Sequence, residues 1–247
     1  MTKVIQSLWI DSVIDEMQVA CIKSFLSKGH EFHLYKYNDI VNVPTGVIVK
    51  DANMIINQSF IFKDKFNSYA TFSDWFRIKL VYELGGWWVD CDVLCLKKFD
   101  TNWPYVFATE IGIVYDREIE QICNAVFKMP KKSSLGKSIL NIIEDRLSQK
   151  MPDEIYWTEI GAKIMAPEIF KFKKQKYIVS PEVFCPINYF NYKDVGKSNL
   201  SVPDSTFGIH IWNKMWEWNR EDPVSGLKND SLLGKFLYSF NLKDEKN

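Results

Sequence analysis

The chain has 247 residues, of which 47% are hydrophobic, so it can form one domain with a large core and is not expected to be disordered. Lysine and arginine together number 31, as do aspartate and glutamate, and this balance gives no general attraction to nucleic acid. Five cysteines without C-x-x-C spacing, no apolar run long enough to span a membrane and no signal peptide together predict a protein that works inside the cell.

The first forty residues predict a β-α-β unit. We expect a strand over 4–10, a helix over 12–28 and a second strand over 31–37. The helix is expected to start at a capping box formed by Ser12 and Asp15 and to end at Gly29. Its apolar residues recur every four positions: Val13, Met17, Cys21 and Phe25. A helix between two strands predicts a parallel sheet with a helix packed against it.

The next well-marked unit is a helix over 68–84, stopped by Gly85 and Gly86 and followed at once by the strand-like stretch "WWVDCDVLCL". Downstream we expect strands at 105–109, 111–115 and 207–212, and helices at 117–128, 134–149, 158–171 and 229–239. Residues 1–242 are predicted to form a single domain, and 243–247 to be a disordered tail.

Two aspartates, Asp90 and Asp92, interrupt the strand-like stretch. Residues i and i+2 of a strand point to the same side, so the two carboxylates would lie close together and raise each other's pKa unless a cation neutralised them. Oxygen ligands of this kind suit Mg²⁺ or Mn²⁺ better than zinc. The alternative is a pair of solvent-facing aspartates on an edge turn.

A competing interpretation of "VDCDVL" is the start of a haloacid-dehalogenase-type phosphatase. Those enzymes complete their magnesium site with a downstream acidic pair in the form Gly-Asp or Asp-Asp. Neither dipeptide occurs in this chain, so the phosphatase is the less favoured hypothesis.

The stretch "YATFSDWFRIKLVYELGGWWVDCDVLCLKKFD", with "SLWI" before it and "HIWNKMW" after it, resembles the glycosyltransferases that carry the DXD motif. That group includes bacterial capsule and lipopolysaccharide enzymes, Golgi mannosyl- and galactosyltransferases, and the catalytic domains of large glucosylating toxins. The resemblance implies an α/β protein of the GT-A type, with a Rossmann-like, mostly parallel central sheet flanked by helices. It also implies a nucleotide-sugar donor, a divalent cation and retention of anomeric configuration.

The resemblance assigns roles to residues around the motif. Asp90 matches the first motif aspartate, near the ribose and the metal, and Asp92 matches the second, the direct metal ligand. Asp74 and Arg77 match the pair that holds the donor's sugar ring, and Ser73 precedes them in the same donor-binding block. Positions i and i+3 share a helix face, which agrees with a joint role, although a surface salt bridge is the simpler alternative.

Residues outside that block are assigned in the same way. Trp9 matches a tryptophan whose ring stacks on uracil; a lone Trp is otherwise a core residue. His210 would complete the metal site, and Trp212 and Asn213 would form part of a lid over the diphosphate; a half-buried structural histidine is the alternative for His210. Asn38 is a weaker candidate for contact with the base.

One departure concerns the acceptor. Relatives carry Thr-Gly-Pro where this chain has Ile160-Gly161-Ala162, so acceptor contacts cannot be transferred, and Glu159 is only a candidate. We therefore expect a retaining transferase that moves a hexose or N-acetylhexosamine from a UDP-sugar to a glycan or lipid-linked oligosaccharide, as in bacterial surface polysaccharide synthesis. We expect it in the cytoplasm, at most peripheral on the inner membrane. A non-catalytic, aromatic-rich sugar-binding module is the alternative.

Overall fold

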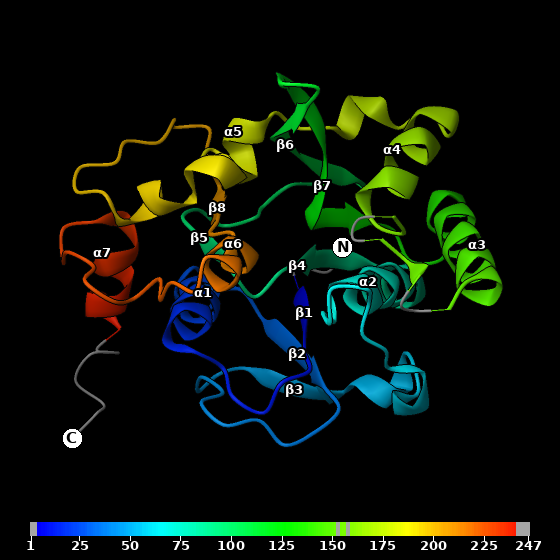
Figure 1. Cartoon of the computed structure of the whole chain (residues 1–247), viewed down its shortest axis with the longest axis horizontal. Coiled ribbons are helices and arrows are strands. Elements are labelled where there is room, and N and C mark those ends of the chain that lie inside the picture. The colour runs from blue at the N-terminus through cyan, green and yellow to red at the C-terminus, as the bar shows by residue number, and fades with distance from the viewer. Residues whose placement is uncertain (1–3, 152–153, 157–158, 241–247) are drawn as a thin grey trace.

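A six-stranded sheet with the order β3-β2-β1-β4-β7-β6 forms the centre of the protein (Figure 1). The structure is a computed structural model that describes residues 4–151, 154–156 and 159–240. The predicted disordered tail therefore lies outside the described residues. The strands are β1 (Ile5–Trp9), β2 (Phe32–Lys36), β3 (Ile48–Asp51), β4 (Gly86–Val89), β6 (Val106–Val114) and β7 (Arg117–Met129).

Four of these strands, β1 to β4, are parallel, and β7 and β6 extend the sheet in antiparallel fashion. A separate two-stranded sheet pairs β5 (Val93–Cys95) with β8 (Gly208–His210). The predicted mostly parallel α/β sheet flanked by helices is thus confirmed. The helices are α1 (Glu16–Ser27), α2 (Ala70–Leu84), α3 (Ser134–Gln149), α4 (Ala162–Lys171), α5 (Pro181–Phe184), α6 (Asn213–Trp218) and α7 (Leu232–Ser239).

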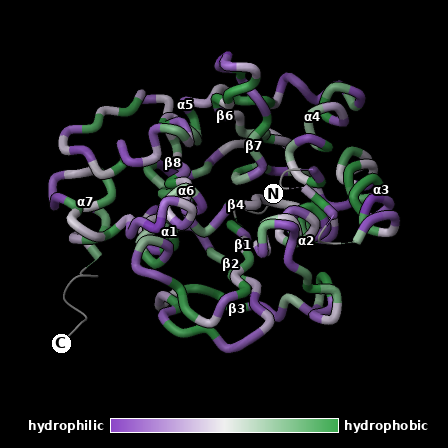
Figure 2. The backbone as a smooth tube through the Cα atoms, in the orientation of Figure 1, coloured by the Kyte–Doolittle hydropathy of each residue, from purple (hydrophilic) through white to green (hydrophobic). Residues whose placement is uncertain are grey.

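Each face of the sheet carries its own hydrophobic core. Helices α1 and α7 pack on one face, and α2, α3 and α4 pack on the other (Figure 1). Alternation along β1 and β4 divides their side chains between the two cores: Ile5 and Trp87 join the first, Leu8 and Trp88 the second. Along α3, hydrophobic and hydrophilic stretches alternate, as expected for a helix with one buried stripe (Figure 2).

The predicted helix over 117–128 is wrong, because this segment is the long strand β7. The two strands predicted before it are one continuous strand, β6, and the two form a hairpin. Its turn is made by Tyr115 and Asp116, which both have positive φ (49° and 59°), the conformation of a two-residue type I′ turn. That turn usually contains Asn or Gly, and neither residue occurs at these two positions, so the turn could not be predicted.

The start of α1 and the end of the motif strand also differ from expectation. The helix begins at Glu16 with Asp15 as its N-cap, and Asp15 makes no side-chain capping bond, so the predicted capping box with Ser12 is wrong. Val13 is exposed instead of buried, and it forms an isolated bridge to Val41. The predicted motif strand is divided into β4 and β5, which belong to different sheets. Strand β3 was not predicted.

None of the helices in the described part of the chain is both long enough and apolar enough to cross a membrane.

Gly85 allows α2 to pass directly into β4. Its φ and ψ are 72° and 177°, a combination that residues with a side chain avoid. A Cβ at this position would also lie 2.6 Å from the backbone nitrogen of Lys131. The short helix-to-strand connection, which places the motif behind α2, therefore requires glycine.

We predict that Gly85→Ala lowers the free energy of unfolding by about 3 kcal/mol, because backbone strain and a steric clash act together. Gly226→Ala is the matched control: Gly226 has a similar φ of 69°, but no atom lies within 4 Å of the added methyl group. Its substitution should cost about 1 kcal/mol. Urea unfolding of both variants measures the difference, and equal losses would show that the contact with Lys131 is unimportant.

Candidate active site

The motif aspartates lie where the sheet changes direction. From β1 the chain moves to β2 on one side, and β4 later pairs on the other side of β1. The carboxyl ends of β1 and β4 therefore form the crevice in which open α/β sheets bind ligands. Trp9 ends β1, and Asp90 follows the last residue of β4.

Asp90 is held by two donors from the α2 side of the sheet. The Nη1 atom of Arg77 lies 3.1 Å from Oδ1 and 3.2 Å from Oδ2, and Nε1 of Trp88 donates to Oδ1 at 2.7 Å. Burial raises the pKa of Asp90 even though Arg77 opposes the shift. Asp90 lies one residue beyond the end of β4, and its N–H donates to the carbonyl of Ala125 in β7 at 2.8 Å.

Asp92 is held from the opposite direction, by the small sheet. Its Oδ2 accepts the N–H of Asn213 at 2.8 Å and lies 3.3 Å from Nε2 of His210. Burial would raise the pKa of Asp92, but His210 and these hydrogen bonds outweigh it and lower the pKa. For His210 burial acts in the opposite direction and lowers the pKa. The carboxylate of Asp92 more than reverses this effect, so the pKa of His210 lies well above its usual value.

The two carboxylates therefore do not depend on a metal alone for neutralisation, as the sequence had suggested. Arg77 compensates Asp90 and His210 compensates Asp92. The donor set still fits a divalent cation, because ligand atoms of Asp90, Asp92 and His210 lie within 4.8 Å of one another. Two carboxylates and one imidazole suit Mn²⁺ or Mg²⁺.

The other side of the His210 ring faces sulfur. Its Nδ1 atom is buried and has no hydrogen-bond partner in the described part of the chain. Thiols of Cys123 and Cys185 and a ring nitrogen of His210 lie within 4.8 Å of one another. All five cysteines are free and buried.

Arg77 is fixed by a network that uses most of its donors. Nε donates to the carbonyl of Ser73, Nη1 to Asp90 and the carbonyl of Asn124, and Nη2 to Oγ of Ser73. A guanidinium has five N–H donors, so one hydrogen on Nη2 stays available. Asp74 lies 3.5 Å from Nε of Arg77 and accepts a bond of 2.7 Å from Asn124. Both side chains of the Asp74–Arg77 pair are more than 90% buried, which excludes a surface salt bridge.

A cavity of about 390 Å³ opens beside these residues. Six of the residues predicted for the site line it: Trp9, Ser73, Arg77, Asp90, Asp92 and Asn213. Trp9 is only partly buried, and its Nε1 donates to the carbonyl of Val13 at 2.9 Å, so the exposed ring is held in a fixed orientation. The structure thus brings together residues that are up to 204 positions apart, as Trp9 and Asn213 are.

Other predicted residues are not at the cavity wall. Asp74 and His210 lie beside wall residues, and Trp212 is buried, packs on His210 with ring centroids 3.9 Å apart and donates to the carbonyl of Ile187. Asn38 is exposed and away from the cavity, and Glu159 is engaged with Lys150 and Arg146.

Comparisons with known proteins identify the region that carries the motif. Residues 13–108 match the family described as "Glycosyltransferase sugar-binding region containing DXD motif". This segment is similar to the sugar-binding region of glycosyltransferases that carry the DXD motif. The resemblance inferred from the sequence is therefore confirmed for the part of the chain that includes Asp74, Arg77, Asp90 and Asp92.

One solved structure agrees at the level of the fold. The glycosyltransferase PaToxG is similar with a TM-score of 0.52 and 14% identity, over 70% of each chain. A transferase mutant matches at 10% identity with a TM-score of 0.43, over 70% of this chain and 86% of its own. Among curated proteins no match was found.

Sequence reasoning missed several residues that line the cavity beside the motif. Gln18 comes from α1, Lys214 and Glu217 from α6, and Lys63, Asn67 and Tyr69 from the segment before α2. Lys214 follows Asn213 directly, so its place in "HIWNKMW" was a usable signal that it lies in the same cavity wall. Gln18 carries no such signal, because it lies in the buried stripe of an ordinary amphipathic helix.

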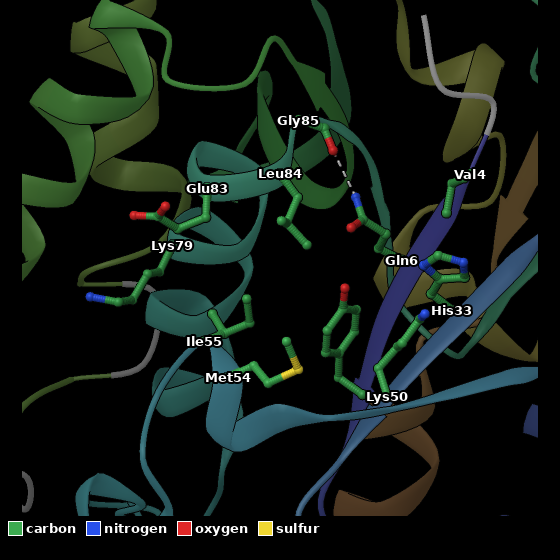
Figure 3. A pocket seen from close by; sticks show the side chains of 11 residues that line it. Val4, Gln6, His33, Lys50, Met54, Ile55, Lys79, Glu83, Leu84 and Gly85 are labelled. Carbon is green, nitrogen blue, oxygen red and sulfur yellow. Dashed lines mark hydrogen bonds between the residues drawn. The ribbon is translucent and has the colours of Figure 1, made fainter.

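A larger cavity, of about 510 Å³, lies at the opposite end of the strands (Figure 3). Its wall includes Gln6, His33, Lys50, Lys79 and Glu83, and Gln6 donates to the carbonyl of Gly85. It has no paired carboxylates and lies away from the motif, so size alone does not locate the site.

Asp74 should make stability depend on pH. Burial raises its pKa to about 6 from 3.8, although Arg77 and Asn124 oppose the shift. A raised pKa means that the folded state holds the proton more tightly, so stability from this group is full below about pH 4 and is lost as pH rises to about 6. We predict that Asp74→Asn gains up to about 3 kcal/mol relative to wild type between pH 4 and pH 7.

Urea unfolding at both pH values, in EDTA, measures this change. The variant also loses the Asp74–Arg77 contact, which changes its stability by the same amount at both pH values. This constant change cancels when the results at the two pH values are compared. A constant difference between variant and wild type across this range would mean that Asp74 is not the titrating group.

Proposed function

We propose that the protein is a metal-dependent, retaining glycosyltransferase. It transfers a hexose or N-acetylhexosamine from a UDP-sugar to a glycan or lipid-linked oligosaccharide, in bacterial lipopolysaccharide, capsule or related polysaccharide synthesis. Residues 1–242 act as one catalytic domain, in the cytoplasm or at the cytoplasmic face of the inner membrane. The family of the motif region supports glycosyl transfer, and the donor, metal and retention follow the resemblance.

One observation carries this proposal. The paired carboxylates of Asp90 and Asp92 meet His210 within 4.8 Å, beside a cavity that also presents the partly exposed ring of Trp9. Such a cavity offers a flat apolar surface for a base and an anionic cluster for a cation within reach of one ligand. A nucleoside diphosphate joined to a sugar has the matching parts.

Asp92 and His210 would hold the cation directly, with Asp90 beside them. A divalent cation here supplies charge stabilisation for the departing diphosphate. Binding at Nε2 requires His210 to release the proton that Asp92 favours, so metal affinity should fall in acid. Lys214 lies in the same cavity wall, but its ammonium is paired with Glu217 at 2.6 Å, so it adds no uncompensated positive charge there.

Arg77 would orient the sugar through its one free Nη2 hydrogen. Because the other four donors are bonded, the guanidinium cannot turn, and this rigidity favours a single donor orientation. We propose a different role for Asp74 from the one that the resemblance implies. Asp74 is not in the cavity wall, so we assign it to positioning Arg77 and Asn124 rather than to contact with the hexose.

A non-catalytic sugar-binding module is the rival function. It would account for an exposed tryptophan beside a cavity but not for the carboxylate pair with its histidine. Release of UDP from a panel of UDP-sugars, compared with GDP release from GDP-sugars, in the presence and absence of Mn²⁺, separates the two functions. Binding without release, for every sugar and with acceptor glycans added, would support the module.

We predict that Asp92→Asn lowers turnover at least about 100-fold, because the variant loses a charged metal ligand. The metal-free variant should also be less stable, by about 1–3 kcal/mol, since His210 loses its buried partner. If repulsion between Asp90 and Asp92 were the larger effect, the metal-free variant would instead be more stable than wild type. Steady-state kinetics with Mn²⁺ and thermal unfolding in EDTA test the two effects. Asp39→Asn, which removes an exposed carboxylate paired with Lys36, is the control and should change neither.

We predict that Trp9→Ala weakens UDP binding by about 1–3 kcal/mol, the usual energy of stacking between a base and an aromatic ring. Trp9→Phe should recover much of the affinity, because it keeps a flat ring. Calorimetry with UDP and Mn²⁺ provides the measurement. Normal UDP affinity in a folded Trp9→Ala protein would contradict the stacking role.

A further inference from the structure

Gln6 and Gln18 are both buried, but they differ in their hydrogen bonding. Gln6 is 3% exposed, and its Nε2 donates to the carbonyls of Gly85 and Trp87. Gln18 is 1% exposed, and its Oε1 is buried without any hydrogen-bond partner in the described part of the chain. Oε1 is the atom of this amide that is both fully buried and unpaired. Gln6 therefore has a structural explanation, and Gln18 has none.

An unpaired buried amide destabilises a folded protein, because it gives up its bonds to water and gains none in return. An apolar side chain would fill this helix position at lower free energy. Unsatisfied polar groups of this kind are rare in native proteins and occur at sites that bind something else. The position of Gln18 shows what that could be.

Gln18 lines the cavity of the candidate active site, on the α1 side. Cys21 lies one turn further along the same helix. The pKa of its thiol is raised mainly by burial and further by Asp92 and Cys91, which are therefore close to it. The amide is therefore near the motif turn, on the side where β1 and Trp9 end. A ligand in the cavity would come within its reach.

The charges around this side of the cavity restrict the group that Gln18 can meet. Asp11 lines the same wall, and Asp11, Asp222 and Glu16 all act on the carboxyl of Asp15 in α1's N-cap; a fourth, Glu217, is paired with Lys214 at 2.6 Å. Their joint negative charge disfavours a phosphate here and favours a group that donates hydrogen bonds. The unpaired Oε1 is itself an acceptor, and it needs such a donor.

We propose that the side-chain amide of Gln18 binds a ribose hydroxyl of the donor nucleotide. This inference rests on the proposed function, but not on the identity of the base, because UDP and GDP share the ribose. A 180° rotation of the amide would exchange the positions of Oε1 and Nε2, and the buried position would still lack a hydrogen-bond partner. A hydroxyl can satisfy either atom, since it both donates and accepts.

The test uses the full-length Gln18→Leu variant and calorimetry with Mn²⁺ and UDP, 2′-deoxy-UDP or 3′-deoxy-UDP. Affinity for UDP should fall about 3- to 10-fold, the effect of one hydrogen bond. One of the two deoxy analogues should bind wild type more weakly than UDP does, yet bind the variant as well as UDP. The melting temperature of the ligand-free variant should hold or rise, because an unpaired buried amide has been removed.

Gln6→Leu is the matched control. It removes a buried amide whose Nε2 donates two hydrogen bonds and which lines the other cavity, so it should lower the melting temperature and leave UDP affinity unchanged. A structural role for Gln18 would give the same result in Gln18→Leu, and that would overturn the inference. Equal sensitivity of wild type and variant to the loss of either hydroxyl would also overturn it.

The failure of the proposed function has a different signature. If wild type binds neither UDP nor GDP with Mn²⁺, the nucleotide-dependent function fails, and the inference fails with it. If wild type binds a nucleotide and Gln18→Leu binds it equally well, only the role of Gln18 is wrong.

Discussion

The contact between Arg77 and Asp90 is the interaction on which the site depends. It joins the middle of α2 to the turn after β4, and it brings a positive charge to a carboxylate whose pKa is raised by burial. Removing one member of such a buried pair leaves the other without compensation, which is far more destabilising than the loss of a surface ion pair. Because Arg77 also bonds to Ser73 and Asn124, the same side chain connects α2, β4 and β7. The geometry of the motif is thus set before any ligand arrives.

The fold explains why these residues meet at one place. Strands β1 and β4 are neighbours and end at the same edge, and α1 and α2 cover opposite faces next to them. Each contributes to the same cavity: α1 gives Gln18, β1 gives Trp9, and α2 gives Ser73 and Arg77. Some of these residues are poorly satisfied by the protein itself, as Gln18 is. Local departures from the most stable sequence at a binding site are expected where a ligand completes the bonding.

The helices and strands around the motif could be predicted from the sequence, because local sequence patterns mark where they begin and end. The periodic apolar residues of α2 and α3 and the glycine pair after α2 defined the elements around the motif. The β6–β7 hairpin could not be predicted, because "REIEQICNAVFKM" becomes a strand through pairing with β6, and its turn lacks the usual glycine. Burial of the Asp74–Arg77 pair and the unpaired amide of Gln18 depend on contacts between distant segments. Neither is visible along a single helix.

The turn from Asp90 to Asp92 is also the junction of two sheets. Asp90 is tied to the large sheet through Ala125, whereas the carbonyl of Asp92 accepts the N–H of Ile211, and the next residue, Val93, pairs with His210 in the small sheet. The first carboxylate is therefore anchored to one sheet and the second to the other. The N–H of Val93 in the small sheet donates to the carbonyl of Asp90 at 3.2 Å and joins the two anchors. The separation of the two carboxylates thus depends on how the small sheet is packed against the large one.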